Sequence, residues 1–127
     1  MENKRILAID DDEGIRESVK DALESKGFSV DTASYGKEAV KMIENNKYNI
    51  IFVDYNLPDM NGVEVCKQIH GIDGGAVKVF MTGSFEEGAD INSREIAFES
   101  FGGEIHYLYK PFIRGELLEI VEKILSR

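Results

Sequence analysis

The stretch IIFVDYNLPDMNG, residues 50–62, decides the fold expected for this 127-residue chain. Its apolar residues run without interruption to a carboxylate, Asp54, and a turn-forming sequence of Asn, Pro, Asp and Gly follows. A continuous apolar run is typical of a strand buried on both faces, as in a parallel sheet that helices cover on each side. The polar turn marks the end of this strand, so we expect Asp54 at the carboxyl edge of the sheet as the candidate reactive residue.

The segments on either side of this strand repeat the same pattern. Three further apolar strands are predicted at residues 6–9, 77–82 and 105–109, and an alternating strand at 28–33 is expected at a wetter sheet edge. Apolar residues at helical spacing predict a helix after each strand, with Ser34 as the cap of the second helix. Strands that alternate with helices predict an α/β fold, a (βα)5 sandwich with one parallel sheet.

Length and composition indicate one globular domain, residues 1–127, without internal repeats. The formal net charge of -9 argues against nucleic acid or an anionic membrane surface as a direct partner. The single cysteine, Cys66, cannot close an intrachain disulfide and is expected to be a small core residue. With no signal segment and no membrane-spanning stretch, the expected location is the cytoplasm.

Polar residues follow four of the predicted strands, and the carboxyl ends of parallel strands share one edge. We therefore expect these residues to converge on one pocket: Asp10, Asp11, Asp12, Asp54, Thr82 and Lys110. Two carboxylates about 4.5 Å apart repel by roughly 3–4 kcal/mol at an effective dielectric of 20, so the acids need a bound cation or raised pKa values. Mg²⁺ suits the site best, because it binds through one or two carboxylates and keeps several waters.

A carboxylate beside Mg²⁺, a lysine and a hydroxyl is suited to phosphoryl transfer. Asp54 is the expected nucleophile, Lys110 neutralises phosphoryl oxygens together with the metal, and Thr82 donates a hydrogen bond. A third acid in the first corner, Asp12, is more consistent with a solvated first-turn residue than with a metal ligand, because the helix dipole favours acids there.

Four motifs stand in order at the ends of these strands: Asp10-Asp11, residues 54–62, Thr82-Gly83, and YLYKPF at residues 107–112. Together they resemble the receiver domain of two-component response regulators, over essentially the whole chain. The resemblance implies a doubly wound, flavodoxin-like sheet with strand order 2-1-3-4-5. It also implies that Asp54 accepts a phosphoryl group from the phosphohistidine of a sensor histidine kinase or phosphotransfer protein, or from a small phosphodonor.

The resemblance further implies which residues hold the metal and transmit the signal. Mg²⁺ would be bound by Asp11, Asp54 and the backbone carbonyl of Asn56, with Asp10 acting through water. Thr82 and Tyr107 would couple phosphorylation to the surface formed by the last two strands and their helices, and the Lys110-Pro111 bond would be cis. Such a domain is not a conventional enzyme, but it is expected to catalyse its own phosphorylation and dephosphorylation.

The chain departs from the family between Thr82 and Lys110, which are 28 positions apart and usually closer. The excess falls in residues 83–92 and in a helix expected from near Asn92. It is consistent with a different partner, a non-standard switch or a tolerated surface insertion. The resemblance also implies that Asn56 and Ser84, two positions after Asp54 and Thr82, influence how fast the acyl phosphate is hydrolysed. A serine positions water only weakly, so we expect Asn56 to be the main determinant of the phosphoryl lifetime.

Three other functions are compatible with parts of the sequence. The first is a receiver-like docking module that is never phosphorylated, in which Tyr107 only packs across strands. A flavin-binding electron carrier would suffer repulsion between Asp10-Asp11-Asp12 and the cofactor phosphate, and an aspartyl phosphatase would usually have an acid where Asn56 stands.

The sequence indicates the type of partner but not its identity. The signal would pass to a downstream protein or a separate output domain, with a phosphorylation-dependent homodimer as a further option. No output domain follows Arg127 in the sequence given. The sequence does not say whether Arg127 is the natural end of the protein. The cognate kinase and the phosphoryl lifetime are also open.

Overall fold

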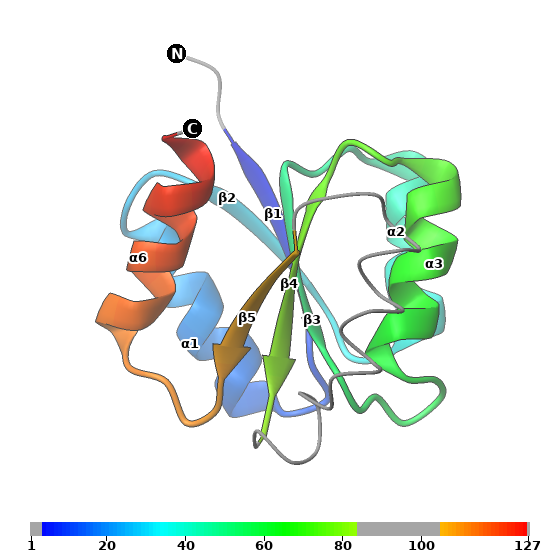
Figure 1. Ribbon diagram of the computed structural model, residues 1–127, viewed down its shortest axis with the longest axis horizontal. Helices are drawn as coiled ribbons and strands as arrows, with labels where there is room; N and C mark the ends of the chain where they lie inside the picture. Colours follow the sequence, from blue (N-terminus) through cyan, green and yellow to red (C-terminus); the bar gives the residue numbers. More distant parts are fainter. Residues whose placement is uncertain (1–3, 84–104, 127) are drawn as a thin grey trace.

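The computed structural model describes residues 4–83 and 105–126 of the chain (Figure 1). Parallel strands alternate with helices, as the sequence predicts. Residues 84–104, which include Ser84, the expected helix from Asn92 and nearly all of the 83–92 segment, lie outside the described residues. The elements are β1 (Arg5–Ile9), α1 (Glu13–Glu24), β2 (Ser29–Ala33), α2 (Gly36–Asn45), β3 (Ile50–Asp54), α3 (Gly62–Ile72), β4 (Val77–Thr82), β5 (Ile105–Tyr109) and α6 (Arg114–Leu125).

The five strands form one parallel sheet in the order β2-β1-β3-β4-β5, which confirms the predicted architecture. β2 lies at one edge, where its alternating sequence placed it. The chain runs outward from β1 to β2 and then returns to β3 on the other side of β1, with Ile6 paired to Ile50. The order of the strands therefore reverses between β1 and β3, which is where ligands bind in open α/β sheets.

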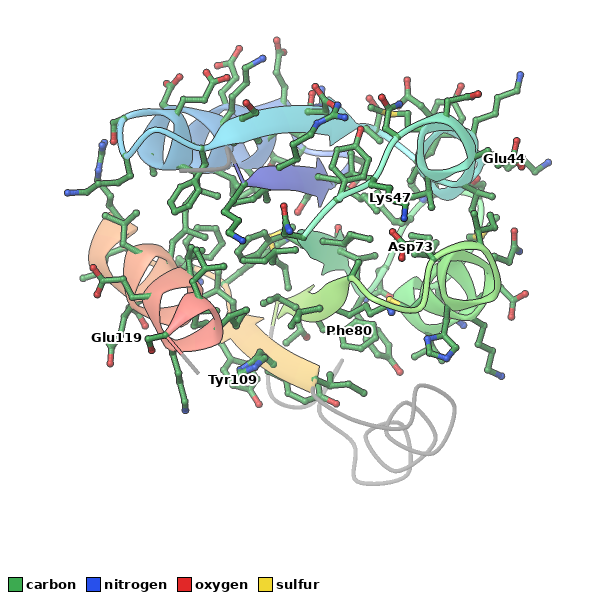
Figure 2. All side chains as sticks on the ribbon, turned by 90° about the horizontal axis from the view of Figure 1, so that it is seen from above. Glu44, Lys47, Asp73, Phe80, Tyr109 and Glu119 are labelled. Atoms are coloured by element: carbon green, nitrogen blue, oxygen red, sulfur yellow. The ribbon has the colours of Figure 1, made fainter. Side chains whose placement is uncertain are left out.

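Helices cover both faces of the sheet (Figures 1 and 2). α1 and α6 lie on one face, and α2 and α3 lie on the other. All five residues of β3 are buried, and the side chains of its four apolar residues enter the two hydrophobic cores alternately. Ile51 and Val53 pack on the α2/α3 side, whereas Ile50 and Phe52 pack on the α1/α6 side. The unbroken apolar run before Asp54 is therefore explained by two separate cores.

Side chains cap the amino ends of α1 and α3, and neither cap was predicted from the sequence. Asp12 caps α1 by accepting a hydrogen bond from the Ile15 N–H at 3.2 Å, which supports its assignment as a first-turn acid. Asn61 caps α3 in the same way, with Glu64 N–H as the donor at 2.8 Å. The predicted cap of α2 by Ser34 is wrong. The N-cap residue is Tyr35, whose side chain makes no capping bond.

Two further predictions concern the packing of Cys66 and Tyr107. Cys66 is fully buried in the α2/α3 core, and burial raises the pKa of its thiol to about 12, so it is a core residue as expected. Tyr107 is paired across the sheet with Phe80, and their rings stack with centroids 5.7 Å apart. In the described part of the chain, no helix combines the length and apolar character needed to cross a membrane.

Candidate functional site

The carboxyl edge of the sheet brings together the polar residues that follow four strands. Asp10 comes directly after β1, Asp54 ends β3, Thr82 ends β4, and Lys110 comes directly after β5. Asp10, Asp54 and Thr82 are buried, with 0%, 7% and 1% of their surfaces exposed. Such burial of two carboxylates is costly unless cations compensate for it.

Lys110 provides one of these cations. Its Nζ lies 2.6 Å from Asp10 Oδ2 and 3.4 Å from Asp54 Oδ2, so one ammonium group contacts both acids. Backbone pairing carries Lys110 to this position, because its N–H donates to the carbonyl of Thr82 at 2.7 Å, one step beyond the Thr82–Tyr109 pair. The Lys110-Pro111 bond is cis, as the resemblance implies.

A third acid joins this pair at the edge. Asp10, Asp11 and Asp54 each offer a carboxylate oxygen, and the three oxygens lie within 4.8 Å of one another. Asp11 is exposed, so the cluster is open to solvent on one side. Asp10 Oδ2 contacts Lys110 but meets no donor at hydrogen-bonding geometry among the described residues. A hard cation that keeps part of its water shell would fit this donor set.

The electrostatics of the site favour an added cation. Burial, and then the charge of Asp10, raise the pKa of Asp54 from 3.8 to about 6, although Lys110 and the Asn56 N–H act in the opposite direction. Burial alone would lower the pKa of Lys110, but its contacts with Asp10 and Asp54 raise it, so the ammonium form is favoured. One lysine therefore compensates only partly for the buried carboxylates.

The loop between β1 and α1 is held from three directions. The Asp10 N–H donates to the carbonyl of Ala33 at 3.1 Å, and the Asp10 carboxylate accepts from the Asp12 N–H at 2.9 Å. From the second turn of α1, Arg16 Nη1 donates to the Asp10 carbonyl at 2.7 Å. Sequence reasoning missed Arg16, because a partly exposed arginine on a polar helix face carries no signal of such a contact.

The loop between β3 and α3 is closed by backbone contacts. Tyr55 N–H donates to the Met81 carbonyl at 2.9 Å, and the Gly62 N–H returns to the Tyr55 carbonyl at 2.7 Å. A Cβ at Gly62 would lie 2.7 Å from the Asp54 carbonyl oxygen, so only glycine permits this approach. Within the loop, the Asn56 N–H donates to Asp54 Oδ1 at 3.3 Å.

This arrangement of acids and lysine agrees with a comparison with known families. The family model of the response regulator receiver domain matches residues 6–122, from β1 into α6. The chain belongs to this family. Membership confirms the resemblance inferred from the four motifs, and it argues against the flavin carrier and the phosphatase. In two-component systems such receiver domains act as phosphoacceptors that interact with histidine kinases or phosphotransfer proteins.

Curated relatives and solved structures support the same family. The receiver chain is 34% identical over 123 residues to response regulator MprA of Mycobacterium sp. (strain KMS), covering 97% of this chain and 51% of that protein. It thus spans about half the length of the curated relatives it matches. A CheY-like receiver domain protein from Methanospirillum hungatei JF-1 superposes with a TM-score of 0.86 at 34% identity, covering 98% of this chain and 96% of that one. A two-component response regulator from Clostridium difficile gives the same TM-score and identity, with 98% of each chain covered.

Proposed function

We propose that this receiver domain, taken as residues 1–127, accepts a phosphoryl group on Asp54 in a Mg²⁺-dependent reaction. The observation that carries the proposal is the contact of one ammonium group, Lys110 Nζ, with both Asp54 and Asp10, beside the carboxylate of Asp11. A buried carboxylate beside a fixed cation, with carboxylate oxygens that fit a divalent metal ion, is equipped to accept a phosphoryl group on oxygen.

The chain's own residues would act as follows. An Asp54 oxygen attacks phosphorus, so a P–O bond forms as the P–N bond to the donor histidine breaks and the imidazole leaves. Lys110 offsets the charge of the phosphoryl oxygens, and the Thr82 hydroxyl donates a hydrogen bond to one of them. Asp11, Asp54 and the carbonyl of Asn56 would hold Mg²⁺, with Asp10 acting through water, and the bound metal would supply further positive charge at the transferred group.

The proposed donors are a sensor histidine kinase, a phosphotransfer protein or a small phosphodonor, and self-catalysed hydrolysis would return Asp54 to its unmodified form. We propose a cytoplasmic location for this receiver domain, because the donor histidine would be phosphorylated from ATP in the cytoplasm. Phosphorylation adds about -1.5 to -2 charges, so new bonds to Thr82 and Lys110 exist only in the modified state. We propose that Thr82 and Tyr107 transmit this change to the surface around β4, β5 and α6. A downstream protein, an output domain or a second receiver would read that surface.

Intact mass after incubation with acetyl phosphate tests the proposal. The protein should gain one phosphoryl group with Mg²⁺ and none in EDTA, and Asp54→Asn should gain none under either condition. Asp21→Asn, at an exposed position on α1, is the matched control and should behave as the wild type. If the wild type gains no phosphoryl group although it binds Mg²⁺, the docking module that is never phosphorylated becomes the better account.

A further inference from the structure

The amino end of α2 is capped by a residue from a distant loop. Its own N-cap residue, Tyr35, makes no side-chain capping bond. Instead, Asp59 Oδ1 accepts from the Gly36 N–H at 2.8 Å and Asp59 Oδ2 accepts from the Lys37 N–H at 2.9 Å. These donors lie 23 and 22 positions before Asp59 in the sequence. One carboxylate therefore ties the β3–α3 loop to the first turn of α2.

The same loop also packs on the helix start through apolar atoms. A Cβ at Gly36 would lie 2.6 Å from Met60 Cγ and 2.8 Å from Val65 Cγ2, so the loop and α3 sit directly against this glycine. Burial would raise the pKa of Asp59, but the hydrogen bonds from Gly36 and Lys37 lower it. The β3–α3 loop is therefore held on the start of α2 both by the hydrogen bonds of the Asp59 carboxylate and by close packing against Gly36.

The β3–α3 loop, which Asp59 holds on α2, begins directly after Asp54, the candidate phosphoacceptor. Asn56, three positions before Asp59, donates its N–H to Asp54 Oδ1 and forms an isolated β-bridge with Asn61 across the loop. The Gly62 N–H closes the loop on the Tyr55 carbonyl. Because both ends of the loop are fixed, the anchor at Asp59 determines where the intervening backbone lies.

We propose that Asp59 is a positioning residue for the phosphoacceptor site. By holding the β3–α3 loop on the start of α2, it fixes the backbone of Asn56 beside Asp54 and beside a divalent cation bound there. The cation part of this inference rests on the proposed function, whereas the placement of the loop does not. Asp59 touches neither the phosphoryl group nor the metal, and acts only through the loop.

The alternative is that Asp59 merely caps a helix, and Glu38 offers a matched control. Glu38 lies in the first turn of α2 and accepts a hydrogen bond from the Ser34 N–H at 2.6 Å, but it has no bond to the β3–α3 loop. Asp59→Ala and Glu38→Ala therefore both weaken the start of α2, and only the first releases the loop. Asp59→Asn keeps one acceptor oxygen and should fall between wild type and Asp59→Ala.

The first readout is independent of metal. Amide hydrogen exchange in EDTA, measured by NMR, should show the Gly62 N–H exchanging about tenfold faster in Asp59→Ala, because local opening of the loop becomes easier. In Glu38→Ala the Gly62 rate should stay at the wild-type value. An unchanged Gly62 rate in folded Asp59→Ala would overturn the proposal.

The second readout is Mg²⁺ affinity, measured by calorimetry on unphosphorylated protein. Loss of residues that orient metal ligands typically weakens binding about 10–100-fold, and we expect at least about fivefold for Asp59→Ala, since it acts through backbone. Glu38→Ala should bind Mg²⁺ as the wild type does. Wild-type affinity in Asp59→Ala would reduce Asp59 to a helix cap. If the wild type itself bound no Mg²⁺, the proposed function would fail, and the exchange rates alone would decide the role of Asp59.

Discussion

The raised pKa of Asp54 predicts that Asp54→Asn stabilises the domain when no metal is bound. Burial and the nearby charge of Asp10 raise this pKa from 3.8 to about 6, so the folded state holds the Asp54 proton more tightly than the unfolded state. Ionisation of Asp54 at pH 7 therefore lowers the free energy of unfolding. The difference of about 2 pH units, at about 1.4 kcal/mol per unit, gives a cost of about 3 kcal/mol.

The pH dependence follows from the same two pKa values. Below pH 3.8 both states carry the proton and the wild type has no penalty, whereas the penalty grows between pH 3.8 and about 6 and is constant above that. Asp54→Asn removes the charge and keeps nearly the same shape. Lys110 Nζ lies 2.6 Å from Asp10 Oδ2 in the wild type, and we expect this contact to keep the lysine charge paired in the variant.

Urea unfolding followed by far-UV circular dichroism measures this effect. In EDTA, the variant should gain up to about 3 kcal/mol at pH 7 and almost nothing at pH 4, while Asp21→Asn should change little at either pH. Saturating Mg²⁺ should then stabilise the wild type more than the variant and narrow the gap, because ligand binding to the folded state adds to its stability. A variant no more stable than wild type at pH 7, or equally stabilised at both pH values, would refute the electrostatic account.

Three further predictions concern neighbouring residues. Lys110→Met should slow phosphorylation of Asp54 by acetyl phosphate about 100-fold, because a fixed positive charge at the transferred phosphoryl group is lost. Lys20→Met, at an exposed position, is the control, and an equal rate in the two variants would contradict this prediction. Gly62→Ala should lower the free energy of unfolding by about 1–3 kcal/mol, because its Cβ would lie 2.7 Å from a backbone oxygen, and urea unfolding at wild-type stability would exclude that clash. Asp59→Ala should destabilise the domain by about 0.5–2 kcal/mol at pH 7, because the start of α2 loses its capping carboxylate. Because the pKa of Asp59 is lowered from 3.8, this difference should shrink as the pH falls below 3.8, and unfolding curves that keep a constant gap would disprove the charge effect.

Local sequence patterns were sufficient for the strands and for most of the pocket. The run that ends in Asp54 marks a strand buried on both faces, and the parallel topology then brings Asp10, Thr82 and Lys110 to the same edge. These residues could be predicted because each stands directly at the end of a strand, so the fold alone places it. Their roles in the reaction stay predictions.

Contacts between distant segments could not be predicted in the same way. Ser34 has the residue type and local position of a helix cap, but Asp59 from another loop occupies that role. Asp59 itself reads locally as one residue of a Pro-Asp turn, and nothing in its neighbours indicates the helix that it meets. Arg16 is similar, because its bond to the Asp10 carbonyl depends on the path of the loop and not on a periodic pattern.

The distribution of the pocket along the chain has a consequence for protein synthesis. The carboxylate of Asp10 and the ammonium group of Lys110 are in contact, although Lys110 is synthesised 100 positions after Asp10 (110 minus 10). Long-range pairing of this kind forms late in folding, because the intervening loop must close first. A nascent or truncated chain that ends before β5 would carry Asp54 but lack the cation beside it. On this account, phosphoacceptor activity requires synthesis through β5 and Lys110, so chains that stop earlier would not divert phosphoryl groups from chains that contain Lys110.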